Sequence, residues 1–203
     1  MLKDTAFFLF YLAFVLFSPL IHAQETSEGV QFEFIIPEPE RRSLAPENPE
    51  PLSRQFRELH LGMGLDNLKS ALMEDQLFRF RGDRDVSFLP IREETLVETT
   101  GSSFIRRAHF QLADEAVYIM SFSLDTRLID HYSVFTSFVR KYGEPLVLSP
   151  GEAVWETDEI RVSIERPLTV KYIDRIVFNR LTEESRANES RELLRREEFL
   201  ADF

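Results

Sequence analysis

The chain contains no cysteine, one tryptophan and seven glycines among its 203 residues. The absence of cysteine excludes disulfide bonds, and it also excludes a lipid attached through a cysteine after an export signal. Such a chain has to fold on a hydrophobic core. The roughly 180 residues that follow its N-terminal segment are enough to build one domain around that core.

Positive charge is also scarce. The chain has 24 Lys and Arg residues against 35 Asp and Glu residues, which gives a formal net charge of −11. Binding to a nucleic acid relies on neutralising phosphates with Lys and Arg, so this balance argues against a nucleic-acid partner. It also disfavours docking on anionic lipid surfaces, and its simplest consequence is solubility.

Residues that could carry chemistry are few and scattered. His60, His109 and His131 are the histidines beyond residue 23, and no pair of them has the spacing of a helical metal site. The adjacent acidic pairs would point to opposite faces of a strand, and no serine stands in a nucleophile elbow. We therefore predict no catalytic residue, no metal site and no cofactor.

A long hydrophobic run occurs once, at the N-terminus. Residues 1–23 combine Lys3, an apolar stretch from Ala6 to Leu16, Pro19 and a small residue at Ala23. This pattern is typical of an export signal that is removed after translocation. We expect a mature chain that works outside the cytoplasm, in the periplasm or cell envelope, with no membrane span of its own.

An uncleaved anchor is the alternative for this segment. Its apolar stretch approaches the roughly 18 to 20 residues that a membrane span needs. Asp4 offsets the charge of Lys3, and Ile21 stands where most cleavage sites have a small residue.

Residues 24–55 have the composition of a tether. Prolines interleaved with glutamates favour extended conformations, and here they are Pro37, Pro39, Pro46, Pro49 and Pro51. Within this segment, Val30, Phe32, Phe34 and Ile36 alternate with other residues in a strand-like period of two. This piece would pair with a sheet edge of the domain or of a partner, or it would be part of a flexible arm.

Periodicity predicts an α+β domain over residues 56–180. A helix is expected at 65–74, strands near 86–89 and 95–100, and a hairpin at 104–112 and 116–124. A longer helix follows at 128–142, capped by Asp125 or Thr126, and then strands at 153–157, 160–165 and 172–179. Helices should cover one face of an antiparallel sheet, in two possible tandem units, 56–125 and 126–180. Residues 181–203 form a charged C-terminal helix that docks on the domain, binds a partner or is simply solvated.

Short motifs in both units resemble known exported domains. The run Leu61-Gly62-Met63-Gly64 followed by Leu65, Leu68 and Leu72 resembles the outer-membrane assembly lipoprotein family of the small protein A type. The run from Lys141 to Pro145, followed by a Trp-bearing strand, is similar to units of β-lactamase inhibitor proteins. Both families place helices on one face of an antiparallel sheet and bind other proteins, and the inhibitor fold repeats this unit in tandem. The lipid-bearing cysteine of the lipoproteins is missing here, and no binding residue can be carried over.

One strand face stands out as a candidate contact surface. Arg107, His109 and Gln111 alternate along a strand whose other face is apolar, so they should share its polar side. A solvated sheet face would show the same pattern. These residues favour an exported, non-catalytic protein-binding module or adaptor with a partner protein in the envelope. The alternatives are a carrier of a small apolar ligand in a Phe-lined cavity and an envelope hydrolase.

Overall fold

The computed structural model describes residues 44–89, 94–201 and 203. The expected export signal and the alternating segment at 30–36 lie outside the described residues. The described end of the proposed tether lies on the domain. There the backbone N–H of Glu50 donates to the carbonyl of Lys141 at 2.8 Å, and Leu52 packs against the core.

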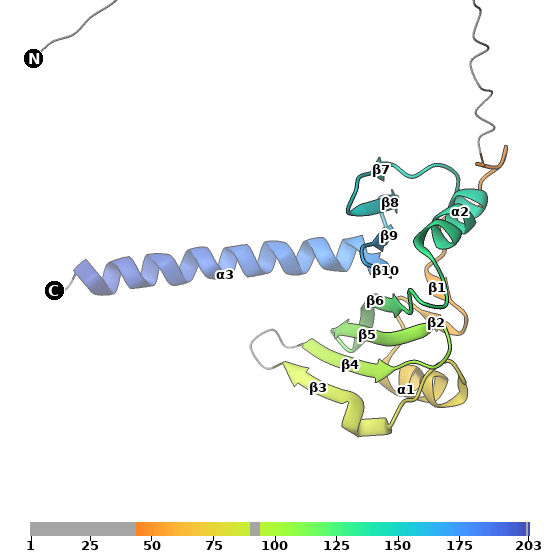
Figure 1. Cartoon of the computed structure of the whole chain (residues 1–203). Helices are drawn as coiled ribbons and strands as arrows, with labels where there is room; N and C mark the ends of the chain where they lie inside the picture. The colour runs from red at the N-terminus through yellow and green to blue at the C-terminus, as the bar shows by residue number, and fades with distance from the viewer. Residues whose placement is uncertain (1–43, 90–93, 202) are drawn as a thin grey trace, which may run out of the picture. The chain divides into compact units, whose positions relative to one another are not determined.

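An eight-stranded antiparallel sheet dominates the domain and confirms the predicted α+β class (Figure 1). Its strands are β3 (Val86–Leu89), β4 (Glu94–Thr100), β5 (Ile105–Ala113), β6 (Ala116–Leu124), β7 (Val147–Leu148), β8 (Glu152–Glu156), β9 (Ile160–Glu165) and β10 (Thr169–Asp174). A separate two-stranded hairpin joins β1 (Gln55–Phe56) to β2 (Leu59–His60).

The strand order is β3-β4-β5-β6-β10-β9-β8-β7. Each half of the chain therefore supplies a run of strands that pair in sequence order, and the two runs meet where β6 pairs with β10. Each run follows one helix, α1 (Leu65–Glu74) or α2 (His131–Tyr142). This is the arrangement of two helix-plus-strands units that the sequence indicated.

Helix α1 has the predicted bounds, whereas α2 begins three residues later than expected. Asp130, not Asp125 or Thr126, is its N-cap, and its carboxylate accepts from the N–H of Ser133 at 2.9 Å. Asp125 instead closes the preceding turn, because its carbonyl accepts from the N–H groups of Leu128 and Ile129. A short 3-10 helix, η1 (Gly82–Asp85), directly precedes β3.

The end of the last strand also differs from the prediction. Strand β10 ends at Asp174, and residues 175–179, expected as strand, open the helix α3 (Arg175–Ala201). The Asp174 carboxylate accepts from the N–H of Val177 at 3.1 Å, as an N-cap residue does. Apolar residues on both sides of the boundary made it look like one continuous strand in the sequence.

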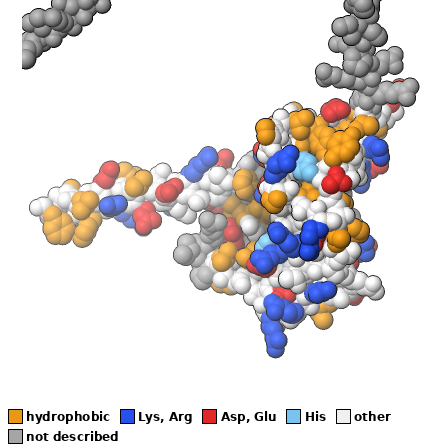
Figure 2. Space-filling model, viewed as in Figure 1, with side chains coloured by type: hydrophobic (Ala, Val, Ile, Leu, Met, Phe, Trp, Pro, Cys, Tyr) orange, Lys and Arg blue, Asp and Glu red, His pale blue; other side chains and the backbone are white. Residues whose placement is uncertain are grey.

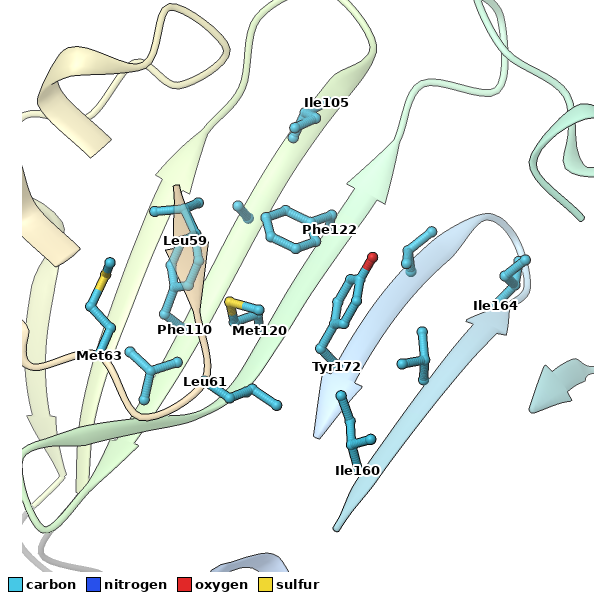
Figure 3. Packing of buried hydrophobic residues seen from close by; sticks show 14 of the residues in the cluster. Leu59, Leu61, Met63, Ile105, Phe110, Met120, Phe122, Ile160, Ile164 and Tyr172 are labelled. Atoms are coloured by element: carbon cyan, nitrogen blue, oxygen red, sulfur yellow. The ribbon is translucent and has the colours of Figure 1, made fainter. Parts of the chain in front are cut away.

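The core fills the space between one face of the sheet and the two helices (Figure 3). Phe122 of β6 lies at its centre, with ring-centroid distances of 4.5 Å to Phe56, 5.8 Å to Phe110 and 6.2 Å to Tyr172. In the second half, the indole N–H of the buried Trp155 donates to the carbonyl of Gly143 at 2.8 Å and fixes the C-terminal end of α2.

The pairing between β5 and β6 is irregular, so strict alternation over 104–112 and 116–124 assigns some of these residues to the wrong face of the sheet. A register shift between Ile105 and Arg107 buries Ile105 and leaves Phe104 half exposed, so Phe104 and Arg106 do not continue the apolar face of Ala108. A second shift places Val117 in the main core and moves Tyr118 into a separate cluster with Ile119. Each register shift inserts one extra residue into one of the two strands. The residues beyond it then point to the opposite face from the one that strict alternation predicts.

Truncating the central ring tests this account of the core. We expect Phe122→Ala to lower the free energy of unfolding by about 3–5 kcal/mol, because a fully buried aromatic side chain leaves a cavity. Phe88→Ala, at a side chain that is 63% exposed, should cost less than about 1 kcal/mol. Urea unfolding of the two variants measures both free energies. Equal losses of stability would contradict the placement of Phe122 at the centre of the core.

A second test concerns the close approach at Gly101. A Cβ atom added there would lie 2.2 Å from the backbone oxygen of Ile105, whereas one added at Gly151 would meet no atom closer than 3.9 Å. We expect Gly101→Ala to destabilise the fold by about 1–3 kcal/mol because the backbone must shift. Gly151→Ala is the matched control and should be neutral or slightly stabilising in the same thermal melts.

Candidate functional site

The second face of the sheet is polar over its central strands. One row of paired residues crosses five strands of this face and consists of Glu98, His109, Ser121, Lys171 and Ser163. The neighbouring row consists of Thr100, Arg107, Ser123, Thr169, Glu165 and Glu152. We call this surface the open face, because the core described above lies on the other side of the sheet.

Arg107 and His109 converge on a shared acidic partner. The Arg107 Nη1 atom lies 3.0 Å from Glu98 Oε1, and the His109 Nε2 atom lies 3.6 Å from Glu98 Oε2. All three side chains keep between 32% and 53% of their surface exposed. The structure therefore brings two of the three predicted contact residues together, around a glutamate that the sequence did not single out.

Gln111 belongs to a different network. Its Oε1 atom lies 3.0 Å from the hydroxyl of Tyr118, which is also 3.2 Å from a carboxylate oxygen of Glu94. Tyr118 and Glu94 are buried, so Gln111 is turned towards the protein as well as towards solvent. Gln111 therefore stabilises the local pairing of β5 with β6. This makes it a weaker candidate for a contact residue than Arg107 and His109.

Further charged pairs extend the open face towards β8. Lys171 Nζ lies 2.7 Å from Glu165 Oε2, and Arg161 Nη2 lies 3.0 Å from Glu152 Oε2. Strand alternation puts Arg161 and Glu165 on one face of β9, whereas the sequence alone does not single out Glu98. Only its register against His109 marks it as part of the site, and that register comes from the tertiary pairing of β4 with β5.

Burial lowers the pKa of His109 below its ordinary value of 6.5. The carboxylate of Glu98 acts in the opposite direction and favours the imidazolium, while the guanidinium of Arg107 adds to the lowering. The imidazole is therefore mostly neutral near pH 7.

Lys and Arg side chains gather on the face in view over the central strands (Figure 2).

A groove of about 770 Å³ lies at the end of the sheet near the β5–β6 turn. Its lining includes the first residues of α1, the turn residues Asp114 and Glu115, and Arg180 and Glu184 of α3. Asp114 and Glu115 both have positive φ, where Asn and Gly are the usual residues. Arg180 forms ion pairs with Asp114 and Glu184, so the one cation of the lining is already partnered within the chain.

Asp125, His60 and His131 lie in other parts of the domain than the open face. Among the described residues, no group of three or more His, Asp or Glu side chains is placed to hold a metal ion. The pKa of Asp125 is lowered to about 2, because the side chain and backbone of Arg127 donate hydrogen bonds to its carboxylate. That pair fixes the turn before α2, so its shift has a structural cause. His131 opens α2, with its side chain only partly buried, and His60 lies in β2.

The Glu98 cluster makes a titration prediction. We expect His109 to titrate below 6.5 in the folded protein, with Glu98→Gln lowering its pKa further and Arg107→Gln raising it. The first variant removes a charge that favours the imidazolium and the second removes one that opposes it. NMR chemical shifts of the imidazole against pH measure the midpoints. Shifts of the opposite sign would mean that these side chains do not face one another.

The chain was compared with protein-family models, with curated proteins and with solved structures, and the first of these comparisons identifies its family. No match was found among curated proteins or among solved structures. Residues 54–184 match the family model described as the TP0088 domain, which covers well over half of the chain, from β1 to the first turns of α3. The chain therefore belongs to the TP0088 domain family.

Proposed function

We propose that this protein is an exported, non-catalytic protein-binding module of the periplasm or cell envelope. The observation that carries the proposal is the open face, where cross-strand ion pairs lie on a sheet whose opposite face holds the core. The cluster of Glu98, Arg107 and His109 is the proposed centre of contact.

The geometry of this face suits recognition because it is already organised. Its side chains stand on hydrogen-bonded strands, and the ion pairs hold long side chains in defined positions. A partner would therefore lose less conformational entropy on binding such a surface than on binding flexible side chains. Mixed charges in fixed positions select a partner with the complementary pattern and steer its approach.

Export remains an inference from residues 1–23, which lie outside the described residues. Among the helices that are described, none is long and apolar enough to cross a membrane. The proposed resemblance to exported binding domains agrees with the arrangement of helices on one face of an antiparallel sheet.

The alternative functions gain no specific support. A carrier of an apolar ligand would need an apolar cavity, whereas the groove near the β5–β6 turn is open to solvent and more than half of its lining side chains are polar. A hydrolase would need acid–base groups clustered in a cleft. The groove near the β5–β6 turn is acidic, but it has no histidine or lysine in its lining.

The proposal is tested by capture from an envelope extract with the chain from Gln24 as bait. We expect Arg107→Glu/His109→Ala to weaken binding of the captured partner about tenfold or more, because the charge pattern at the centre of contact is inverted. Surface plasmon resonance with the identified partner measures the change.

A matched control carries the same substitutions on α2. Arg140→Glu/His131→Ala makes the same change of charge within α2, away from the open face, so it should bind like the wild type. An equal loss of affinity in both variants would show that binding depends on the net charge of the protein and not on the open face. A bait that captures nothing would count against the binding module.

A further inference from the structure

The open face continues beyond β4 to Arg79. Phe78 is buried in the core, so strand alternation places the next residue, Arg79, on the opposite side of the chain. Phe78 forms an isolated bridge with Gly101, directly after β4. The backbone N–H of Arg79 donates to the carbonyl of Thr100, the last residue of β4, at 2.8 Å. Arg79 therefore stands next to Thr100 and opens the row that continues to Arg107.

Arg79 and Arg107 flank Thr100 from two neighbouring segments. Adjacent strands of a sheet are about 4.8 Å apart, so the Cα atoms of the two arginines are about 10 Å apart. All three residues are exposed, and their side chains belong to the same side of the sheet. The Thr100 hydroxyl forms no hydrogen bond within the described part of the chain. Two guanidinium groups and a hydroxyl thus form one short polar row.

This corner of the open face holds positive charge that the chain does not neutralise. Among the described residues, no acidic side chain forms an ion pair with Arg79 or with Arg106, the exposed residue at the bulge before Arg107. Arg107 has one partner, Glu98, whose Oε1 atom lies 3.0 Å from Nη1. The remaining N–H donors of its guanidinium are left for another acceptor. Three arginines therefore face one glutamate, in a chain whose formal net charge is −11.

Asp125, in the turn after β6, does not change this balance. Its carboxylate accepts from the Nε–H of Arg127 at 2.9 Å, so Asp125 and Arg127 neutralise each other. Hydrogen bonds from Arg127 are the main reason that the pKa of Asp125 is lowered to about 2, and the charge of Arg106 adds to the lowering. Arg106 thus acts on Asp125 through space, without a hydrogen bond that would hold its guanidinium in place.

Two arginines at this spacing suit an extended acidic segment. Alternate side chains of an extended chain lie on one side and are about 7 Å apart. The flexible ends of arginine and glutamate side chains span the remaining difference, so that one carboxylate meets each guanidinium. The pair of Arg107 with Glu98 shows that a carboxylate fits a guanidinium on this face. Negative charge over the rest of the chain would repel a long polyanion, so the segment in contact is short.

We propose that the arginine corner, made of Arg79, Thr100, Arg106 and Arg107, binds two carboxylates of an extended acidic segment of the partner protein. One carboxylate pairs with Arg79 and the other with Arg107. Thr100 donates its hydroxyl between them, and Arg106 adds positive charge. The corner is part of the open face, so this binding rests on the proposed function and specifies the chemistry of the partner.

Glu98 competes with the incoming carboxylate for Arg107. Removing the charge of Glu98 should therefore strengthen the binding of an acidic segment, whereas removing an arginine should weaken it. Opposite effects at neighbouring positions separate recognition from damage to the fold, because a damaged fold would weaken binding in both cases.

Titration with acetylated hexaglutamate tests the corner in the full chain, as the cell produces it. NMR signals of the backbone amides and of the arginine Nε–H groups report both the dissociation constant and the place of binding. We expect Arg79→Gln and Arg107→Gln each to raise the dissociation constant about threefold or more, because each removes one charge-assisted hydrogen bond. Arg140→Gln is the matched control, since it removes the same charge from an exposed position on α2 and should bind like the wild type.

Glu98→Gln gives the sharper result in the same titration. We expect it to lower the dissociation constant for hexaglutamate about threefold, because Arg107 then has no competing carboxylate. Unchanged or weaker binding by Glu98→Gln would overturn the proposal. So would a loss in Arg140→Gln as large as the loss in Arg79→Gln, or a wild type that does not bind hexaglutamate.

Inorganic phosphate separates a site for an acidic segment from a general anion site. A single small anion contacts one arginine at a time across this separation, so phosphate should displace hexaglutamate only at a much higher concentration. Displacement by phosphate at equal concentration would overturn the assignment of an acidic segment.

The captured envelope partner distinguishes the corner from the binding module as a whole. Weaker binding of that partner by both Arg79→Gln and Arg107→Glu/His109→Ala would support the corner. A partner that loses binding to the double variant but binds Arg79→Gln as tightly as the wild type would overturn the corner and leave the binding module standing. Hexaglutamate bound at the corner without capture of any partner would support the corner and count against the binding module.

Discussion

The pairing of β6 with β10 is the interaction on which the rest of the domain depends. It joins the two runs of strands into one sheet and places Phe122 of the first half against Tyr172 and Val170 of the second. Since Phe122 also contacts Phe56 and Phe110, the hairpin β1–β2 and both halves share one core. Neither half has a complete core without this contact.

The same sheet separates a structural face from an exposed one. Helices α1 and α2 supply apolar side chains to one side, so the other side can carry charged residues without a burial penalty. Cross-strand pairing then decides which charges meet, and it brings Glu98 to Arg107 and His109. The two β-bulges set the limits of this face, because they turn Tyr118 towards it and return Val117 to the core.

Membership of the TP0088 domain family covers the sheet, both packed helices and the first turns of α3. The apolar end of α3 lies beyond the matched residues. The open face belongs to the domain that defines the family.

Local patterns in the sequence determined much of this protein. Period-two and period-3.6 spacing gave α1, the hairpin of β5 and β6 and the α+β class, because these patterns report which side of each segment is buried. Capping at Asp130, the boundary at Asp174 and the two bulges were decided only in the tertiary structure. Each of these features depends on the partner that a backbone or side-chain group contacts. That partner is either distant in the sequence or one of several equally suitable residues nearby. Glu98 shows the same limit at the site, since nothing in its own segment indicates that it lies opposite His109.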